Sequence, residues 1–471
     1  MSSELREIPP VDRLLARFAD AWPDVPRPLL ASALRDLTER VRSDARARPP
    51  ASGVLQALFA AGGAFESQLA ARLAALTAPR HVRVVNATGV LLHTGLGRAP
   101  LAASVQEALA RVLRYGIVEV DPATGERGRR ETFVRDLLCE LTGAEEATLV
   151  NNNAAAVLLL LRGMAAGREV VVSRGELVEI GGGFRVPQVM EQSGALLKEV
   201  GTTNRTRVAD YAAATSAATA MYLHVHSSNF KMVGFTEQPK LADLVVLGKE
   251  RGVPVCADLG SGYLRRFAQL PFPDEPAVVE AVAAGCDVVT FSGDKMLGGP
   301  QCGILVGKRD AILKLRAAPL FRAVRPDKLM LAAMEATLLE WRKSGDALPT
   351  GVPFFAMLAA SLETLRARAQ ALLVNSRLPP SFARVVDSKS QVGSGSVPGL
   401  EFDSVALALE APGGKADALA MRLRTGAPPV FPRVHEGKVL LDLRTIFPDE
   451  DAEVAAALAR LSDAAPTASK S

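Results

Sequence analysis

The sequence has 471 residues, of which 48% are hydrophobic, 23% are charged and 5% are aromatic. This is an ordinary globular balance, and the length excludes a single small core in favour of two or three domains. The formal net charge of +4 permits an anionic partner but does not require one.

The cysteine spacing and the lengths of the apolar runs indicate where in the cell the protein is expected. Cys139, Cys256, Cys286 and Cys302 form no CxxC pair and have no zinc spacing, so no metal site is expected. The start, MSSELREIPP, lacks the form of a signal peptide, and the longest apolar run, AAAVLLLL, is far short of a membrane span. A cytoplasmic protein without a membrane segment is therefore expected.

Residues 1–75 are predicted to form a separate helical N-terminal domain with its linker. VDRLLARFADAW and PLLASALRDLTERVRSDARAR carry apolar residues at helical spacing, and prolines separate them. Arginines gather at 40, 42, 46 and 48, which fits either a solvated helix face or a phosphate-binding surface. Nearby acidic residues almost balance them, so charge alone leaves both interpretations open.

Residues 76–335 show a different sequence pattern, in which short apolar runs alternate with stretches of helical periodicity. The runs include ATLVN, REVVVS, AMYLHVH, VPVCADLG, DVVTFSG and GILVGK. This alternation predicts an α/β domain with a mostly parallel central sheet. Polar or glycine-rich residues follow nearly every run, where ligands of such sheets bind.

Residues 336–471 are predicted to form a smaller α+β C-terminal domain. A helical stretch, PFFAMLAASLETLRARAQALL, precedes short strand-like runs. HEGK between two of these runs indicates a hairpin.

The polar residues after the predicted strands suit pyridoxal 5′-phosphate. This cofactor needs a lysine for its Schiff base, an anion opposite the pyridinium nitrogen and backbone N–H groups for its phosphate. Lys295 and Asp258 match the first two needs, and an asparagine run before an apolar helix matches the third. The expected cofactor-binding residues are Lys295, Asp258, Asn152, Asn153, Ser292 and His226.

Each of these signals alone has a plainer interpretation. The asparagines could cap a helix, Asp258 could hold a turn, and Lys295 could be solvated. Their joint order along the chain favours a pyridoxal phosphate enzyme. A Rossmann NAD enzyme is disfavoured because GLGRAP lacks the last glycine of the dinucleotide fingerprint.

Several stretches carry a specific resemblance. They are IPPVDRLL, RVVNATGVLLHTGLGRAPL, GERGRR, RGELVEIGGGFRVP, HSSNFKMVGFTE, ADLGSG, FSGDKMLGGPQCGILVGK and LLDLRTI. In them the chain resembles the bacterial selenocysteine synthases, the L-seryl-tRNA(Sec) selenium transferases, over nearly its whole length. His224, where a lysine is expected in many relatives, is a mild departure.

The resemblance implies a fold-type I, aminotransferase-like pyridoxal phosphate transferase whose N-terminal domain binds selenocysteine tRNA. Lys295 would carry the cofactor and remove the seryl Cα proton. Loss of water would give an aminoacrylyl intermediate, to which selenium from selenophosphate adds. The family also implies a homo-oligomer, a decamer built from dimers.

The resemblance further implies three anion-binding arginines, Arg98, Arg322 and Arg325, whose guanidinium groups suit the oxygens of selenophosphate. Asp294 is a candidate for assisting proton transfer or departure of the leaving group, with a loop cap as the equal alternative.

Two rival functions stay open at this point. The chain could be a pyridoxal phosphate lyase or desulfurase acting on a free amino acid or amino-sugar acid, although residues 1–75 and the three arginines argue against it. It could also be a non-catalytic RNA-binding protein, which intact Lys295 and Asp258 disfavour.

Overall fold

The computed structural model describes residues 7–48, 50–51, 53–180 and 183–462. The chain divides into two compact units, residues 1–83 and 84–471. The sequence-based boundaries at 75 and 335 fall inside helices α4 (Ala64–Thr77) and α14 (Lys328–Ser344). Within the described ranges, no helix is both long enough and apolar enough to cross a membrane.

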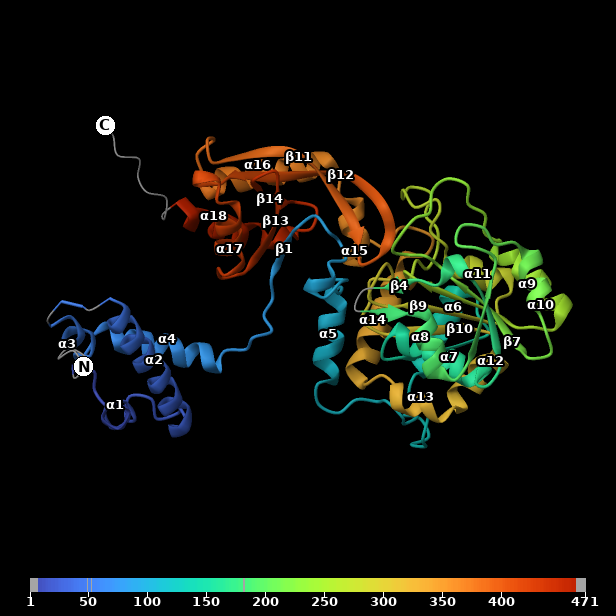
Figure 1. The fold of residues 1–471 in the computed structure, drawn as a ribbon, viewed down its shortest axis with the longest axis horizontal. Helices are drawn as coiled ribbons and strands as arrows, with labels where there is room; N and C mark the ends of the chain where they lie inside the picture. The colour runs from blue at the N-terminus through green and yellow to red at the C-terminus, as the bar shows by residue number, and fades with distance from the viewer. Residues whose placement is uncertain (1–6, 49, 52, 181–182, 463–471) are drawn as a thin grey trace. The chain divides into compact units, whose positions relative to one another are not determined.

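The first unit is helical, with α1 (Val11–Phe18), α2 (Arg27–Ala47), α3 (Val54–Leu58) and α4 (Figure 1). Its core is built from the apolar faces of these helices, including Leu14, Leu34 and Leu69. The rings of Phe59 and Phe65 lie 4.4 Å apart between their centroids. This core is separate from the apolar clusters of the second unit.

The second unit contains a seven-stranded sheet with the order β2-β10-β9-β8-β7-β3-β6. Only β10 among these strands runs antiparallel to its neighbours, so the predicted mostly parallel sheet is confirmed. The strands are β2 (Glu146–Val150), β3 (Glu169–Ser173), β6 (Leu196–Val200), β7 (Thr219–Val225), β8 (Val255–Gly260), β9 (Val288–Ser292) and β10 (Gly303–Gly307).

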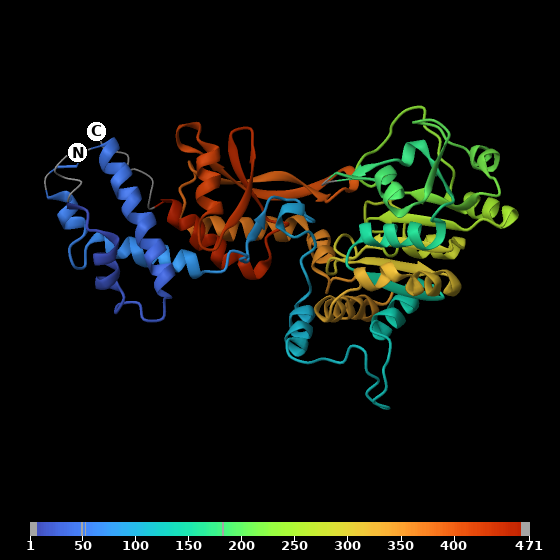
Figure 2. The ribbon, with the colours of Figure 1, turned by 60° about the horizontal axis from the view of Figure 1, so that its bottom comes forward.

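Helices cover both faces of this sheet (Figure 2). Side chains of successive strand residues point to opposite faces, so Val170 and Val172 join one core while Val171 joins the other. The helices are α5 (Ala103–Val112), α6 (Thr132–Thr142), α7 (Asn153–Ala165), α8 (Val186–Ser193), α9 (Val208–Ala214), α10 (Leu241–Arg251), α11 (Val278–Ala284), α12 (Arg309–Ala317), α13 (Pro319–Val324) and α14. Short elements are η2 (Thr94–Leu96), η3 (Arg174–Glu176), β4 (Glu179–Ile180) and β5 (Phe184–Arg185).

The C-terminal part of the second unit is a five-stranded sheet with the order β1-β13-β14-β12-β11. The predicted hairpin at HEGK is confirmed, because β13 and β14 pair with His435 opposite Lys438. Strand β1 joins this sheet in parallel with β13, although it precedes the large sheet in the chain (Figure 1). The strands are β1 (Val85–Ala87), β11 (Ala383–Gly393), β12 (Ser396–Glu410), β13 (Val430–His435) and β14 (Lys438–Asp442).

Helices α16, α17 and α18 pack their apolar residues against this second sheet. The long β11–β12 hairpin extends to the large sheet's domain, where Val397, Leu400 and Phe402 pack against its core (Figure 1). The remaining elements are α15 (Pro353–Ala359), α16 (Leu362–Ser376), η4 (Pro412–Gly414), α17 (Ala416–Arg424), η5 (Pro448–Glu450) and α18 (Asp451–Ser462).

Candidate cofactor site

The carboxyl ends of β2, β7, β8 and β9 bring the predicted cofactor residues to one edge of the large sheet. These strands run in the same direction, and polar residues follow each of them. The main-chain N–H of His226, just after β7, donates to the carbonyl of Asp258 in β8 at 2.9 Å. Ser292 ends β9, three residues before Lys295.

Asp258 is the buried anion of the site, with 5% of its surface exposed. The amide of Asn153 donates to its Oδ1 at 2.9 Å, and the hydroxyl of Thr290 donates to the same oxygen at 3.0 Å. Burial raises the pKa of Asp258, although both hydrogen bonds and the Lys295 amine oppose that shift. Because Asn153 and Thr290 both donate to Oδ1, the Asp258 carboxylate is held in one orientation.

Lys295 is also buried, with 6% of its surface exposed. Burial lowers the pKa of its amine, while the negative charge of Asp258 opposes that shift. The loop is fixed on one side by the Met296 N–H, which donates to the Ser261 carbonyl at 2.9 Å. A lowered pKa increases the neutral fraction of the amine, which is the form that attacks a carbonyl carbon.

Asp294 and Arg98 form an ion pair directly beside this lysine. Nη1 of Arg98 lies 2.6 Å from Oδ2 of Asp294, and the Asp294 side chain is 7% exposed. Arg98 has a positive φ of 64° in the turn after η2, which commits its backbone to an uncommon conformation. The positive charge of Arg98 also contributes to the lowered pKa of Lys295, after burial.

Asn152 caps the N-terminus of α7, and its side chain accepts from the Ala155 N–H at 2.9 Å. The carbonyl of Asn152 lies so close to Gly303 that a side chain at Gly303 would collide with it. The exposed N–H groups of a helix N-terminus attract phosphate. Asn152 thus orients the helix end by capping it.

Arg322 and Arg325 lie in and just after α13. The Asn151 N–H donates to the Val324 carbonyl at 2.8 Å, which joins the end of α13 to the start of α7. Arg325 lies 3.7 Å from Glu119, and Arg322 is exposed. No contact among the described residues joins either of them to Arg98.

Buried polar atoms without a partner among the described residues show that the residues at this sheet edge fit pyridoxal phosphate. Several buried hydrogen-bonding atoms at this sheet edge have no partner in the described portion of the chain, among them Ser261 Oγ, Ser227 Oγ and Asn153 Oδ1. Buried polar atoms are nearly always satisfied, so their position here indicates a missing polar ligand. Lys295, Asp258 and the N-terminus of α7 would hold its aldehyde carbon, ring nitrogen and phosphate.

Reasoning from the sequence missed two buried glutamates near these residues. Glu176 in the RGE turn lies 2.9 Å from His224, and its other oxygen accepts from the Val225 N–H at 2.9 Å. Glu275 lies 3.4 Å from His226. The specific RGELVEIGG stretch was a usable signal for Glu176, whereas PFPDEP carries no pattern for Glu275.

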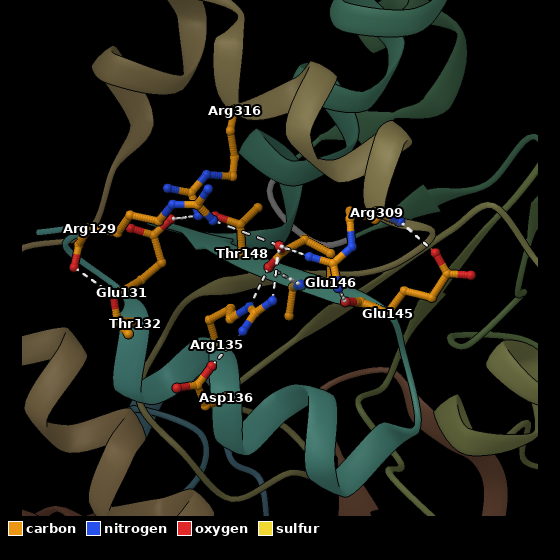
Figure 3. A network of polar contacts seen from close by, with 11 residues as sticks. Arg129, Glu131, Thr132, Arg135, Asp136, Glu145, Glu146, Thr148, Arg309 and Arg316 are labelled. Carbon is orange, nitrogen blue, oxygen red and sulfur yellow. Dashed lines mark hydrogen bonds and ion pairs between the residues drawn. The ribbon is translucent and has the colours of Figure 1, made fainter.

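A polar network fixes β2, the strand that leads into α7 (Figure 3). Glu146 at its start is fully buried, and Arg135 of α6 lies 2.5 Å and 3.1 Å from its two oxygens. Burial opposes ionisation of Glu146, but Arg135 outweighs it and the pKa is lowered. Glu131 pairs with Arg316 at 2.5 Å and accepts from Thr148 at 3.1 Å.

Comparison with known proteins identifies relatives that span nearly the whole chain. The family model described as L-seryl-tRNA selenium transferase matches residues 84–447. The L-seryl-tRNA(Sec) selenium transferase of Geobacter metallireducens is 48% identical, with 93% of this chain and 94% of the relative covered. That of Solidesulfovibrio magneticus is 46% identical, with 98% of each covered.

A solved structure shows the fold. D-Glucosaminate-6-phosphate ammonia-lyase matches with a TM-score of 0.57 at 21% identity, covering 81% of this chain and 96% of that one. The expected fold-type I pyridoxal phosphate architecture is confirmed, and so is the family resemblance. From the family model and the full-length relatives it follows that the chain belongs to the L-seryl-tRNA(Sec) selenium transferase family.

Proposed function

We propose that the Lys295 site converts L-seryl-tRNA(Sec) to L-selenocysteinyl-tRNA(Sec), with selenophosphate as the selenium donor. The observation that carries this proposal is a buried amine set between a buried carboxylate and an arginine–aspartate pair. That arrangement suits removal of a carbon-bound proton close to a site for an anionic reactant.

Lys295 attaches the cofactor and then acts as the base. When bound, pyridoxal phosphate supplies an electron sink for negative charge at the seryl Cα. Because burial lowers the pKa of Lys295, a larger fraction of its amine is neutral and its Nζ can take up the Cα proton. Loss of the seryl hydroxyl as water then opens Cβ to selenium.

Asp258 sets the electrostatics of the ring nitrogen. Asn153 and Thr290 fix its Oδ1, so the negative charge stays where a protonated ring nitrogen needs it. The N–H groups at the start of α7, capped by Asn152, bind the phosphate together with Ser292. His226 borders the same site through its main-chain hydrogen bond to Asp258.

Arg98, Arg322 and Arg325 bind the oxygens of selenophosphate in this proposal. Asp294, next to Lys295, assists proton transfer or departure of the seryl hydroxyl. Since Arg98 and Asp294 are 2.6 Å apart, an arriving anion competes with Asp294 for the guanidinium. Arrival of the donor would thereby change the charge balance around Lys295.

The helical unit of residues 1–83 is assigned to binding selenocysteine tRNA. Relatives named as transferases of this tRNA align with it as well as with the catalytic unit. The protein acts in the cytoplasm as a homo-oligomer, a decamer built from dimers. An exposed apolar run supports self-association: Leu113, Tyr115, Ile117 and Val120 are between 52% and 101% exposed.

In vitro turnover tests the function. The purified, cofactor-loaded protein is incubated with seryl-tRNA(Sec) and selenophosphate, and the tRNA-bound amino acid is identified by mass spectrometry. Selenocysteinyl-tRNA is expected with the wild type and absent with Lys295→Ala. Release of ammonia or sulfide from free amino acids, with seryl-tRNA left unchanged, would instead favour a lyase.

A further inference from the structure

A cavity of about 620 Å³ opens beside the candidate cofactor site. Its walls come from three segments: the residues after β7, the loop before α11 and the tip of the β11–β12 hairpin. We call it the hairpin cavity and define it by His226, Phe230, Pro273, Glu275, Val397 and Leu400. This volume lies within the range of small-molecule sites and is large enough for a nucleoside.

The inner end of the hairpin cavity carries a buried carboxylate. Glu275 is 4% exposed, and its Oε2 lies 3.4 Å from Nε2 of His226. Its other oxygen, Oε1, has no hydrogen-bond partner among the residues described. A buried carboxylate oxygen without a partner is costly, so this position indicates a donor supplied by a ligand.

This inner end borders the reacting groups. His226 donates its main-chain N–H to the carbonyl of Asp258 at 2.9 Å. Glu275 is close enough to Lys295 to oppose the lowering of the lysine pKa that burial causes. A ligand in the hairpin cavity would therefore end next to the amine that takes part in the reaction.

The mouth of the cavity offers an aromatic face. Phe230 is 38% exposed although it is a large apolar residue, and Val233 nearby in the chain is 87% exposed. Lys231 and Asp274 at the rim lie 3.2 Å apart and neutralise each other. An uncharged flat ring matches this mouth better than a phosphate does.

We propose that the hairpin cavity binds the 3′-terminal adenosine of the seryl-tRNA. Glu275 accepts a hydrogen bond from the ribose hydroxyl next to the ester, and Phe230 stacks on the adenine. The inference rests on the proposed function. A seryl group whose Cα lies at Lys295 has its ribose only a few bonds away, through the ester, so the ribose must lie near that lysine. A carboxylate that accepts from ribose and an aromatic ring that stacks on a base are recurrent modes of nucleotide recognition.

A stable probe tests the proposal. 3′-Deoxy-3′-(L-serylamino)adenosine carries serine through an amide and keeps the neighbouring 2′-hydroxyl. Its binding to the cofactor-loaded, full-length protein is followed by the change in the visible absorbance of the bound cofactor. Phe230→Ala is expected to weaken binding about 10-fold, a typical loss for one stacked base. Phe133→Ala removes another exposed phenylalanine, which lies outside the cavity and is 52% exposed, and should leave binding unchanged.

Glu275→Gln tests the proposed hydrogen bond to the ribose separately from the stacking of Phe230 on the adenine. It should weaken the 3′-amide probe about 10-fold, whereas the 2′-deoxy form of the probe should bind both proteins equally. Dissociation constants within twofold of wild type for both Phe230→Ala and Glu275→Gln would overturn the inference. A change of oligomer mass in Phe230→Ala without a change in probe affinity would overturn it too, and would make the cavity an interface between copies.

The two proposals fail in different ways. If the wild type makes selenocysteinyl-tRNA but neither variant alters probe binding, only the adenosine site is wrong. If the wild type makes no selenocysteinyl-tRNA, the proposed function itself is wrong.

Discussion

A substitution at Asp258 should lower turnover without preventing the cofactor from binding. Asp258→Asn keeps the size of the side chain but removes the negative charge opposite the ring nitrogen. We expect turnover to fall about 10²–10³-fold, while the visible absorbance of the bound cofactor persists because Lys295 is intact. Single-turnover rates and absorbance spectra measure the two effects. Thr290→Val removes only one hydrogen bond to Asp258 and is the control; equal losses in both variants would contradict this role of the charge.

His224 and Glu176 predict a pH dependence of stability. Burial disfavours protonation of His224, but the carboxylate of Glu176 at 2.9 Å outweighs it, so the histidine pKa is raised. A raised pKa means that the folded state binds the proton more tightly. The His224–Glu176 pair therefore contributes fully to the free energy of unfolding below about pH 6.5, the ordinary histidine pKa. This contribution is lost as the pH rises through the raised pKa of His224.

Glu176→Gln should remove this contribution while keeping an oxygen to accept from the Val225 N–H. At about pH 6 the variant should be less stable by about 1.5–3 kcal/mol, the range for hydrogen bonds to charged groups. The difference should shrink towards alkaline pH. Urea unfolding at several pH values measures it, and parallel profiles for the two proteins would show that the pair is not charged.

The main residues of the site were predictable because strand ends have a readable pattern. Lys295, Asp258 and Asn153 each follow or end an apolar strand, and the structure brings them together. Glu275 was not predictable, since it lies in an irregular loop and meets His226 only in the folded chain. The roles of Arg98, Arg322 and Arg325 stay predictions.

At the scale of elements, β2 depends on the pairing of Glu146 with Arg135. Arg135→Met would leave the fully buried Glu146 with the Ala147 N–H at 3.1 Å and the more distant Arg129 and Arg309, 3.8 Å and 3.7 Å away. Loss of one partner of a buried ion pair costs about 3–5 kcal/mol, so we expect a destabilisation near 3 kcal/mol by urea unfolding. The double variant Arg135→Met, Glu146→Gln should recover part of it, and no recovery would contradict the pairing.

The sequence explains the direction of β10 but not the strand with which β1 pairs. β9 and β10 are joined by the Lys295 loop without a crossover helix, which is why β10 runs antiparallel in an otherwise parallel sheet. That reason is visible in the sequence. The pairing of β1 with β13, with Val85 opposite Val430, is not, because apolar periodicity carries no information about partners so distant in the chain.

At the scale of the whole molecule, self-association predicts a change of mass. Tyr115 is fully exposed and Ile117 is 60% exposed, in a segment after α5 that lacks regular structure (Figure 1). The double variant Tyr115→Asp, Ile117→Asp should lower the mass measured by light scattering, because charges are disfavoured at the centre of an interface. Val374→Asp, at a 74% exposed position of α16, is the control. An unchanged mass would place the interface elsewhere.

The separate cores of the two units predict that catalysis and tRNA capture can be divided. Because the apolar cluster of residues 1–83 shares no residue with those of 84–471, a variant that lacks the first unit should still fold and bind the cofactor. Its visible absorbance should match that of the full chain, while its affinity for selenocysteine tRNA falls at least about 10-fold, as expected when phosphate contacts are removed. Gel-shift titrations at fixed salt, with serine tRNA as the reference, measure this. Equal affinity with and without residues 1–83 would place tRNA recognition in the catalytic unit.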